Sequence, residues 1–203
     1  MKDSTDETAA ALAARASAGP ETLARLHHRL EAAARHEGLL DVAYTTIDTP
    51  VGPLLLASTA KGLVRVAYAG EDHEKVLDAL ADRLSPRVLR APGRLDDAAR
   101  EIDQYFAGER KTFELALDLT LSSGFRRLVQ SHLPEIAYGH TLSYAQVAQL
   151  VGSPKAVRAV GTACATNPLP VVLPCHRVVR SDGTQGGYVG GPAAKTTLLN
   201  LET

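Results

Sequence analysis

Tryptophan is absent from this chain of 203 residues, and cysteine and methionine are scarce, with two and one residues. Cys164 and Cys175 can form at most one disulfide, which excludes the disulfide-rich class of small secreted proteins. No segment approaches the roughly 20 apolar residues of a membrane-spanning helix. The acidic opening residues are also unlike a secretory signal. These absences predict a cytoplasmic protein with reduced thiols and no membrane partner.

Net charge is also nearly absent, at −1, but its distribution along the chain is uneven. Residues 121–203 carry seven Lys and Arg against three Asp and Glu, whereas residues 1–120 carry fifteen against twenty. Phosphate contacts are electrostatic, so a local excess of positive charge matters more than the total. The C-terminal half is therefore the candidate for binding nucleic acid, although scattered solvated charge would give the same counts.

The hydrophobic content of 45% is sufficient for a core, and the chain divides into three parts. Residues 1–40 are expected to form an N-terminal extension, consisting of a polar tail and an amphipathic helix over 21–37. Residues 41–120 are expected to form an α/β domain in which a small mixed sheet packs with helices. Its expected elements are strands over 42–48, 54–58, 63–68 and 113–119 and helices over 72–84 and 95–106.

Residues 121–203 are expected to form a mainly helical domain with a helix-turn-helix. Ser122 and Ser123 offer an N-cap to a first helix that runs to Leu133. A helix over 144–151 and a turn at Gly152 precede a second helix that starts at Pro154. Helix pairs of this kind are also common in proteins that do not bind DNA, so the pattern alone does not assign a function.

One cysteine and one histidine stand together in Pro174-Cys175-His176-Arg177-Val178, directly after an apolar run. A thiol with an ordinary pKa of about 8.5 is only about 3% ionised at pH 7. A nucleophilic cysteine therefore needs a neighbouring base, which His176 could supply.

Further motifs surround this block over the 60 residues from Ser143 to Glu202. They are Ser143-Tyr144, Arg158-Ala159-Val160-Gly161, Asn167-Pro168, Gly187-Tyr188-Val189-Gly190-Gly191, Lys195 and Glu202. In order and spacing this stretch resembles the O6-alkylguanine-DNA alkyltransferase family. The resemblance implies irreversible, single-turnover transfer of an alkyl group from O6-alkylguanine, and from O4-alkylthymine, to Cys175. It implies a monomer that acts on double-stranded DNA without a cofactor and flips the base from the minor groove.

The resemblance also assigns roles to individual residues. Glu202 would hold His176, which would act on Cys175 through a water, and this relay would favour the thiolate. Asn167 would brace the turn before the active-site segment. The residues implied to contact the substrate are Tyr144, Arg158, Pro170, Val178, Gly186, Tyr188 and Val189. The residues implied to contact DNA through the second helix of the pair are Ala156, Val157, Ala159 and Gly161.

Within the substrate group, Arg158 would enter the base stack and Tyr144 would help to rotate the nucleotide out. The carbonyls of Cys175 and Val178 would receive the exocyclic amine of guanine, and the backbone at Val189 would face O6. Pro170 and Gly186 would leave room for a bulky alkyl group. Lys195 would lie near the site, although a solvated surface lysine is an equally good interpretation.

The chain departs from the family pattern at Gln130, where a tryptophan is usual, and this puts a detail of packing in doubt. Some members bind zinc in the N-terminal domain, but both cysteines here lie after residue 160, so no metal site is expected. Two other functions are open: a sensor that binds alkylated DNA without reacting, and a cysteine hydrolase that uses Cys175 and His176. Cys175 argues against the sensor, and a hydrolase normally takes its histidine from a distant segment.

Overall fold

The computed structural model describes residues 19–203, so the predicted tail at residues 1–18 lies outside the described residues. Two compact units are present, divided between Leu40 and Asp41. The first contains helix α2 (Pro20–His36), which matches the predicted helix and begins with a proline at its first position. Its leucines Leu23, Leu26 and Leu30 are exposed.

The second unit contains a four-stranded mixed sheet in the order β3-β2-β1-β4. Its strands are β1 (Val42–Ile47), β2 (Leu54–Thr59), β3 (Gly62–Tyr68) and β4 (Val88–Arg90). The first three form the predicted antiparallel meander, and β4 pairs in parallel with β1. The sequence had suggested the meander because Gly62 and its neighbours separate two apolar runs.

The fourth strand is a correction to the sequence analysis, which predicted a strand over 113–119 and none at β4. Residues 113–118 form no strand and make only one isolated bridge, between Leu63 and Leu117. Leu63 alone accounts for the pairing, because its N–H donates to Ala116 and its carbonyl accepts from Asp118. The chain then turns into the 3-10 helix at Leu119–Leu121, so no ladder develops.

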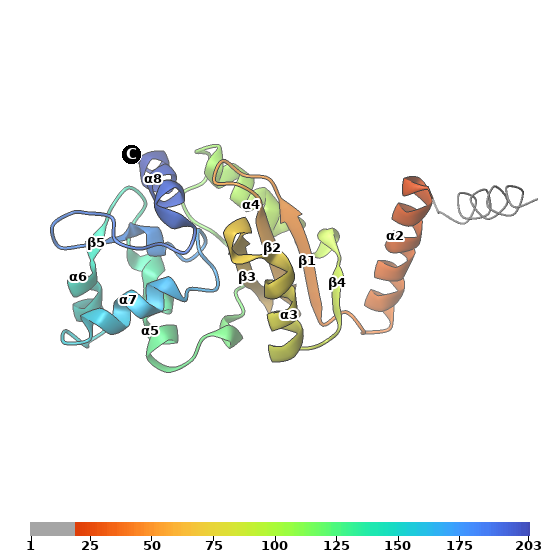
Figure 1. Cartoon of the computed structure of the whole chain (residues 1–203), viewed down its shortest axis with the longest axis horizontal. Helices are drawn as coiled ribbons and strands as arrows, with labels where there is room; N and C mark the ends of the chain where they lie inside the picture. Colours follow the sequence, from red (N-terminus) through yellow and green to blue (C-terminus); the bar gives the residue numbers. More distant parts are fainter. Residues whose placement is uncertain (1–18) are drawn as a thin grey trace, which may run out of the picture. The chain divides into compact units, whose positions relative to one another are not determined.

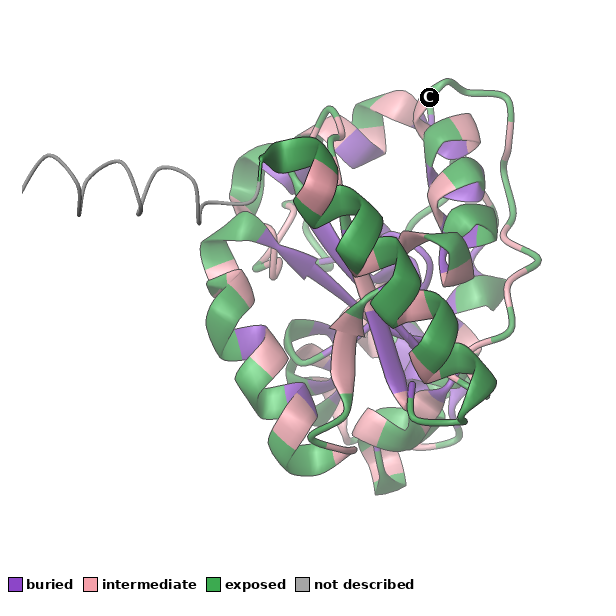
Figure 2. Ribbon diagram, turned by 90° about the vertical axis from the view of Figure 1, so that its right-hand side faces the viewer, coloured by how far each residue is buried: buried purple, intermediate pink, exposed green. Residues whose placement is uncertain are grey.

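Helices α3 (His73–Arg83) and α4 (Asp96–Phe106) cover opposite faces of the sheet (Figure 1). On one face Val76 and Leu80 of α3 pack against Leu55 and Val64, and on the other Ile102 of α4 belongs to the larger core. Figure 2 shows that the strands are mostly buried while the outer sides of the helices are exposed. Because helices cover both faces of the sheet, the residues on both sides of its strands are apolar.

The helical part confirms the expected fold class, with α5 (Gly124–His132), α6 (Tyr144–Leu150), α7 (Val157–Ala165) and α8 (Gly191–Leu201). A two-stranded parallel sheet joins β5 (Leu142–Ser143) to β6 (Val178–Val179). Short 3-10 helices occur at Ala69–Glu71, Pro92–Arg94, Leu133–Glu135 and Cys175–Arg177.

Helix α7 begins at Val157, three residues later than predicted from Pro154. The Ala156 N–H donates to the Ser153 carbonyl at 2.8 Å, so residues 153–156 form a separate turn. Ala156 is consequently the N-cap of α7 and is not inside the helix. The prediction that Pro154 occupies the first helical position is therefore wrong.

Gln130, where the resemblance leads to the expectation of a tryptophan, lies buried on α5. Its Nε2 donates to the Ala163 carbonyl at 2.9 Å, near the end of α7. The last carbonyls of a helix have no partner within the helix, so this contact links α5 to α7. Gln130 therefore contributes a buried hydrogen bond between the two helices.

Candidate active site

Cys175 is buried at the start of the 3-10 helix Cys175–Arg177. Asn167 holds it, because Nδ2 of Asn167 donates to Sγ of Cys175 at 3.2 Å and to the Leu173 carbonyl at 2.8 Å. Oδ1 of Asn167 accepts from the Leu169 N–H at 3.0 Å. One side chain therefore fixes the start of the active-site segment and its reactive end.

Burial raises the pKa of the Cys175 thiol to about 11, although the hydrogen bond from Asn167 and the charge of Lys195 act in the opposite direction. Burial thus opposes the thiolate that the relay is expected to favour, while Asn167 and Lys195 support it. Cys164 is also a free buried thiol, and burial raises its pKa to about 12.

His176 is fully buried beside Glu202, with Nε2 3.0 Å from Oε1. An ionised carboxylate only accepts hydrogen bonds, so Nε2 carries the proton and Nδ1 is left with a lone pair. Nδ1 is buried and has no hydrogen-bond partner among residues 19–203. Burial lowers the pKa of His176 although Glu202 opposes this shift, so the imidazole is a neutral base.

Glu202 binds more residues than the sequence indicated. Arg177 donates to both of its carboxylate oxygens, from Nε and Nη2, each at 2.8 Å. The Tyr105 hydroxyl donates to Oε1 at 2.7 Å. Burial alone would raise the pKa of Glu202, but the hydrogen bonds from His176 and Arg177 lower it to about 2. Glu202 is therefore an anion and not a frayed chain end.

Two of these partners were missed. Arg177 lies within the Pro-Cys-His-Arg-Val block, and a basic residue at that point in a buried segment is itself a signal that a buried carboxylate is near. Tyr105 lies on α4, and nothing in the sequence relates it to a residue 97 positions later.

The loop that carries Tyr188 rests on a residue of the sheet. The hydroxyls of Tyr68, at the end of β3, and Tyr188 are hydrogen-bonded at 2.9 Å. The Tyr188 ring lies edge-on to His176, with ring centroids 6.3 Å apart. A side chain at Gly190 would come within 2.5 Å of the Tyr68 ring, so the loop approaches the sheet too closely for any other residue. Tyr68 was not predicted.

Tyr144 and Gly186 face each other across the site. Tyr144 is the first residue of α6, where Ser143 caps the helix and forms a capping box with Gln146. Gly186 has a φ of +67°, and a Cβ there would lie 2.8 Å from the Tyr144 hydroxyl. Two of the seven residues that the resemblance assigned to the substrate thus lie next to each other.

Lys195 is buried, which decides between the two interpretations of the sequence. Its Nζ donates to the Val178 carbonyl at 2.6 Å and to the Gln185 carbonyl. Burial lowers the pKa of Lys195. The Val178 carbonyl, expected to receive a guanine amine, therefore already accepts one hydrogen bond and has one lone pair left.

The remaining predicted residues lie on α7 and on the two loops. Arg158 and Ala159 are exposed, whereas Ala156, Val157 and Gly161 are half-buried. A Cβ at Gly161 would meet nothing within 4 Å, so this part of α7 is open. Two more predicted residues lie in the segments that flank the site: Pro170 is buried, and Val189 is half-buried.

Neither a metal site nor a membrane span is found in the part of the chain that the structure describes. Residues 19–203 contain no group of three or more His, Cys, Asp or Glu that could hold a metal ion. None of their helices is long and apolar enough to cross a membrane.

Two family models match the chain. The model described as 6-O-methylguanine DNA methyltransferase, ribonuclease-like domain, matches residues 42–119. The model described as 6-O-methylguanine DNA methyltransferase, DNA binding domain, matches residues 124–203. The first 41 residues lie outside both matches.

Curated relatives and a solved structure agree with these matches. A methylated-DNA–protein-cysteine methyltransferase of Methanosarcina barkeri is 37% identical over 159 residues, which are 78% of this chain and 96% of the relative. The constitutive enzyme of Bacillus subtilis is 39% identical over 160 residues, 78% and 94% of the two chains. The crystal structure of Mycobacterium tuberculosis OGT in complex with DNA matches with a TM-score of 0.68 and 36% identity, over 79% of this chain and 92% of that one.

Proposed function

The chain belongs to the 6-O-methylguanine DNA methyltransferase family, and on this basis we propose that it repairs DNA by transferring an alkyl group from O6 of guanine to Sγ of Cys175. The observation that carries the proposal is the buried thiol beside a neutral histidine whose tautomer is fixed by Glu202. We propose that O4-alkylthymine is a second substrate.

In the proposed reaction the Cys175 thiolate attacks the alkyl carbon, the C–S bond forms, and the C–O6 bond breaks with its electron pair moving to oxygen. The thiol proton passes to Nδ1 of His176, directly or through a water, and finally neutralises the leaving guanine. Glu202 stabilises the imidazolium that forms in between. Burial raises the pKa of Cys175, so the thiolate depends on a base that accepts its proton.

A base inside the duplex must leave the stack before it can reach a buried thiol, which costs a few kcal/mol. We propose that α7 docks in the minor groove, with its small residues against the DNA and Arg158 in the gap left by the base. The exposure of Arg158 and Ala159 and the open space at Gly161 support this docking. Tyr144, next to Gly186, would contact the extruded nucleotide.

The product is a thioether, and the described site offers no second reactive thiol to remove the alkyl group, since Cys164 is itself buried and burial raises its pKa. We therefore propose that each monomer acts once and needs no cofactor. Incubation with duplex DNA containing O6-methylguanine should add one methylene to the intact mass of the protein. Cys175→Ser should gain no mass yet bind the DNA, and Cys164→Ser should react normally. An adduct on Cys164, or repeated turnover, would contradict the proposal.

A further inference from the structure

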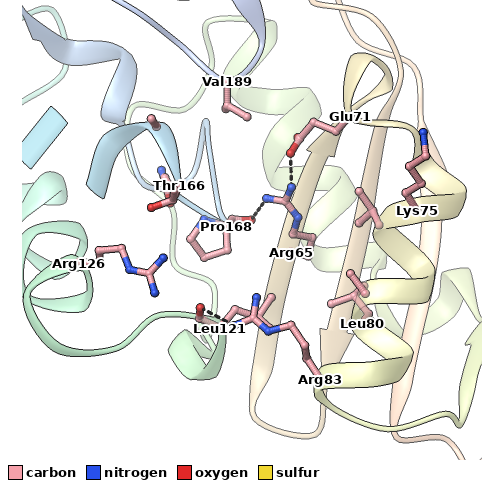
Figure 3. A pocket seen from close by; sticks show the side chains of 14 residues that line it. Arg65, Glu71, Lys75, Leu80, Arg83, Leu121, Arg126, Thr166, Pro168 and Val189 are labelled. Atoms are coloured by element: carbon pink, nitrogen blue, oxygen red, sulfur yellow. Dashed lines mark hydrogen bonds and ion pairs between the residues drawn. The ribbon is translucent and has the colours of Figure 1, made fainter. Parts of the chain in front are cut away.

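A cleft of about 440 Å³ lies between α3 and the chain that leaves α7 (Figure 3). Four cationic side chains line it, Arg65, Lys75, Arg83 and Arg126, against one carboxylate, Glu71. Three of these cations come from the N-terminal half of the chain, in which acidic residues are in excess. The cleft is therefore positively charged although residues 1–120, which supply three of its cations, have a net negative charge.

Two of the cations remain available to a ligand. Arg65 is paired with Glu71 and also donates to the Pro168 carbonyl at 3.3 Å, so it forms part of the wall. Arg83 donates only from Nη2, to the Leu121 carbonyl at 3.1 Å, and keeps its other N–H groups. Figure 3 shows Arg83 and Arg126 extending toward each other from opposite sides. Lys75, at the rim, is paired with the exposed Asp72.

Arg126, which lines the cleft, lies in the first turn of α5. This turn contains Arg126 and Arg127 and no acidic residue, and the N-cap residue Ser123 makes no side-chain hydrogen bond. The N-terminus of a helix is the positive end of its dipole, so arginines there are unfavourable unless an anion is close. A phosphate beside Arg126 would therefore be favoured by the positive end of this helix as well as by the side chain.

The cleft is continuous with the exposed face of α7. Arg158, Thr162, Ala165 and Thr166 are exposed and follow the spacing of one helix face, and the last two line the cleft. Along α7, Thr166 lies about 12 Å from Arg158. At 3.4 Å per base pair this distance corresponds to about four base pairs.

We propose that this cleft binds backbone phosphates of the DNA duplex on one side of the damaged base, with Arg83 and Arg126 as the contacts and Lys75 at the rim. The proposal rests on the proposed function, because it needs a duplex docked on α7. It adds a contact from the N-terminal part of the chain, on α3, to those of the helical part.

The test is the salt dependence of binding to an undamaged duplex. Arg83→Gln/Arg126→Gln keeps a donor for the Leu121 carbonyl but removes both charges. Each lost phosphate contact should reduce the slope of log Kobs against log salt by about 0.9, so the double variant should lose about 1.8. Lys61→Gln/Arg100→Gln removes the same charge from the turn before β3 and from α4, on the opposite face of the sheet, and should keep the wild-type slope. A double variant with the wild-type slope would overturn the inference.

A second measurement tests the direction of the contact. Shortening the duplex to fewer than about four base pairs beyond the lesion should weaken wild-type binding more on one side than on the other. In Arg83→Gln/Arg126→Gln that difference between the two sides should disappear, and its persistence would contradict the inference. Reaction with free O6-benzylguanine should be unchanged in both double variants. If wild-type protein reacts with neither DNA nor the free base, the proposed function itself fails.

Discussion

Arg177 and Glu202 form a bidentate ion pair in the core of the protein, with Nε and Nη2 of the arginine each 2.8 Å from a carboxylate oxygen. Glu202 also accepts a hydrogen bond from His176. The carboxylate that pairs with Arg177 therefore also fixes the tautomer of the proposed base. A buried pair contributes little net stability, but removing one partner leaves the other charge without compensation.

Arg177→Met should therefore lower the free energy of unfolding by about 3–5 kcal/mol. Arg127→Met replaces an exposed arginine and should change it by less than about 0.5 kcal/mol. Urea unfolding of both variants at neutral pH measures the difference. Equal stability of the two variants would show that Glu202 is satisfied without Arg177.

Stability should also depend on pH through Glu202, whose pKa is lowered from 4.5 to about 2. A carboxyl with a lowered pKa in the folded state stabilises the protein above the unfolded pKa and loses this effect as pH falls. The free energy of unfolding should thus decline from about pH 4.5 to about pH 2. In Glu202→Gln this part of the decline should be absent. Denaturant melts over this range test it, and an unchanged decline in the variant would refute the assignment.

Arg158→Ala should slow the repair of duplex DNA by at least tenfold while reaction with free O6-benzylguanine stays nearly intact. Stabilisation of the extruded base is needed only when a base leaves the stack. Each 1.4 kcal/mol of lost stabilisation lowers the rate by a factor of ten. Arg158→Lys should recover part of the rate because it keeps the charge. Lys155→Ala is a control from the exposed turn that precedes α7. Single-turnover rates with duplex DNA and with the free base measure the effect. An equal reduction of both rates would mean that Arg158 has a structural role.

Free O6-benzylguanine should transfer its benzyl group to Cys175, because Pro170 and Gly186 are expected to leave room for a ring. Gly186→Ala should reduce this reaction, since its Cβ would lie 2.8 Å from the Tyr144 hydroxyl and the backbone φ is +67°. Gly187→Ala places a Cβ in open space next to it and is the matched control. Pre-incubation with the compound, followed by an assay of methyl transfer, measures the effect. Full residual activity of the wild type would exclude a roomy pocket.

The sequence determined most of the local structure and pointed to the residues proposed to react. Alternating and helical spacing of apolar residues predicted the meander and the main helices, and the local motifs brought Asn167, Cys175 and His176 together. These features depend on interactions between residues that are close in the sequence, so the local sequence predicts them. Where local signals were weak, as at β4 and Pro154, the prediction failed because pairing with β1 and a competing turn decided the structure.

Only the tertiary structure decided which distant residues support the site. Tyr105 and Tyr68 lie 97 and 120 positions from the residues that they bind, and their hydroxyls reach Glu202 and Tyr188 only because the sheet packs against the helical part. The same packing buries Cys175 and raises its pKa, which a sequence motif alone would suggest is lowered. Burial and electrostatic environment are properties of the assembled core, and contacts of such sequence separation leave no local pattern in the chain.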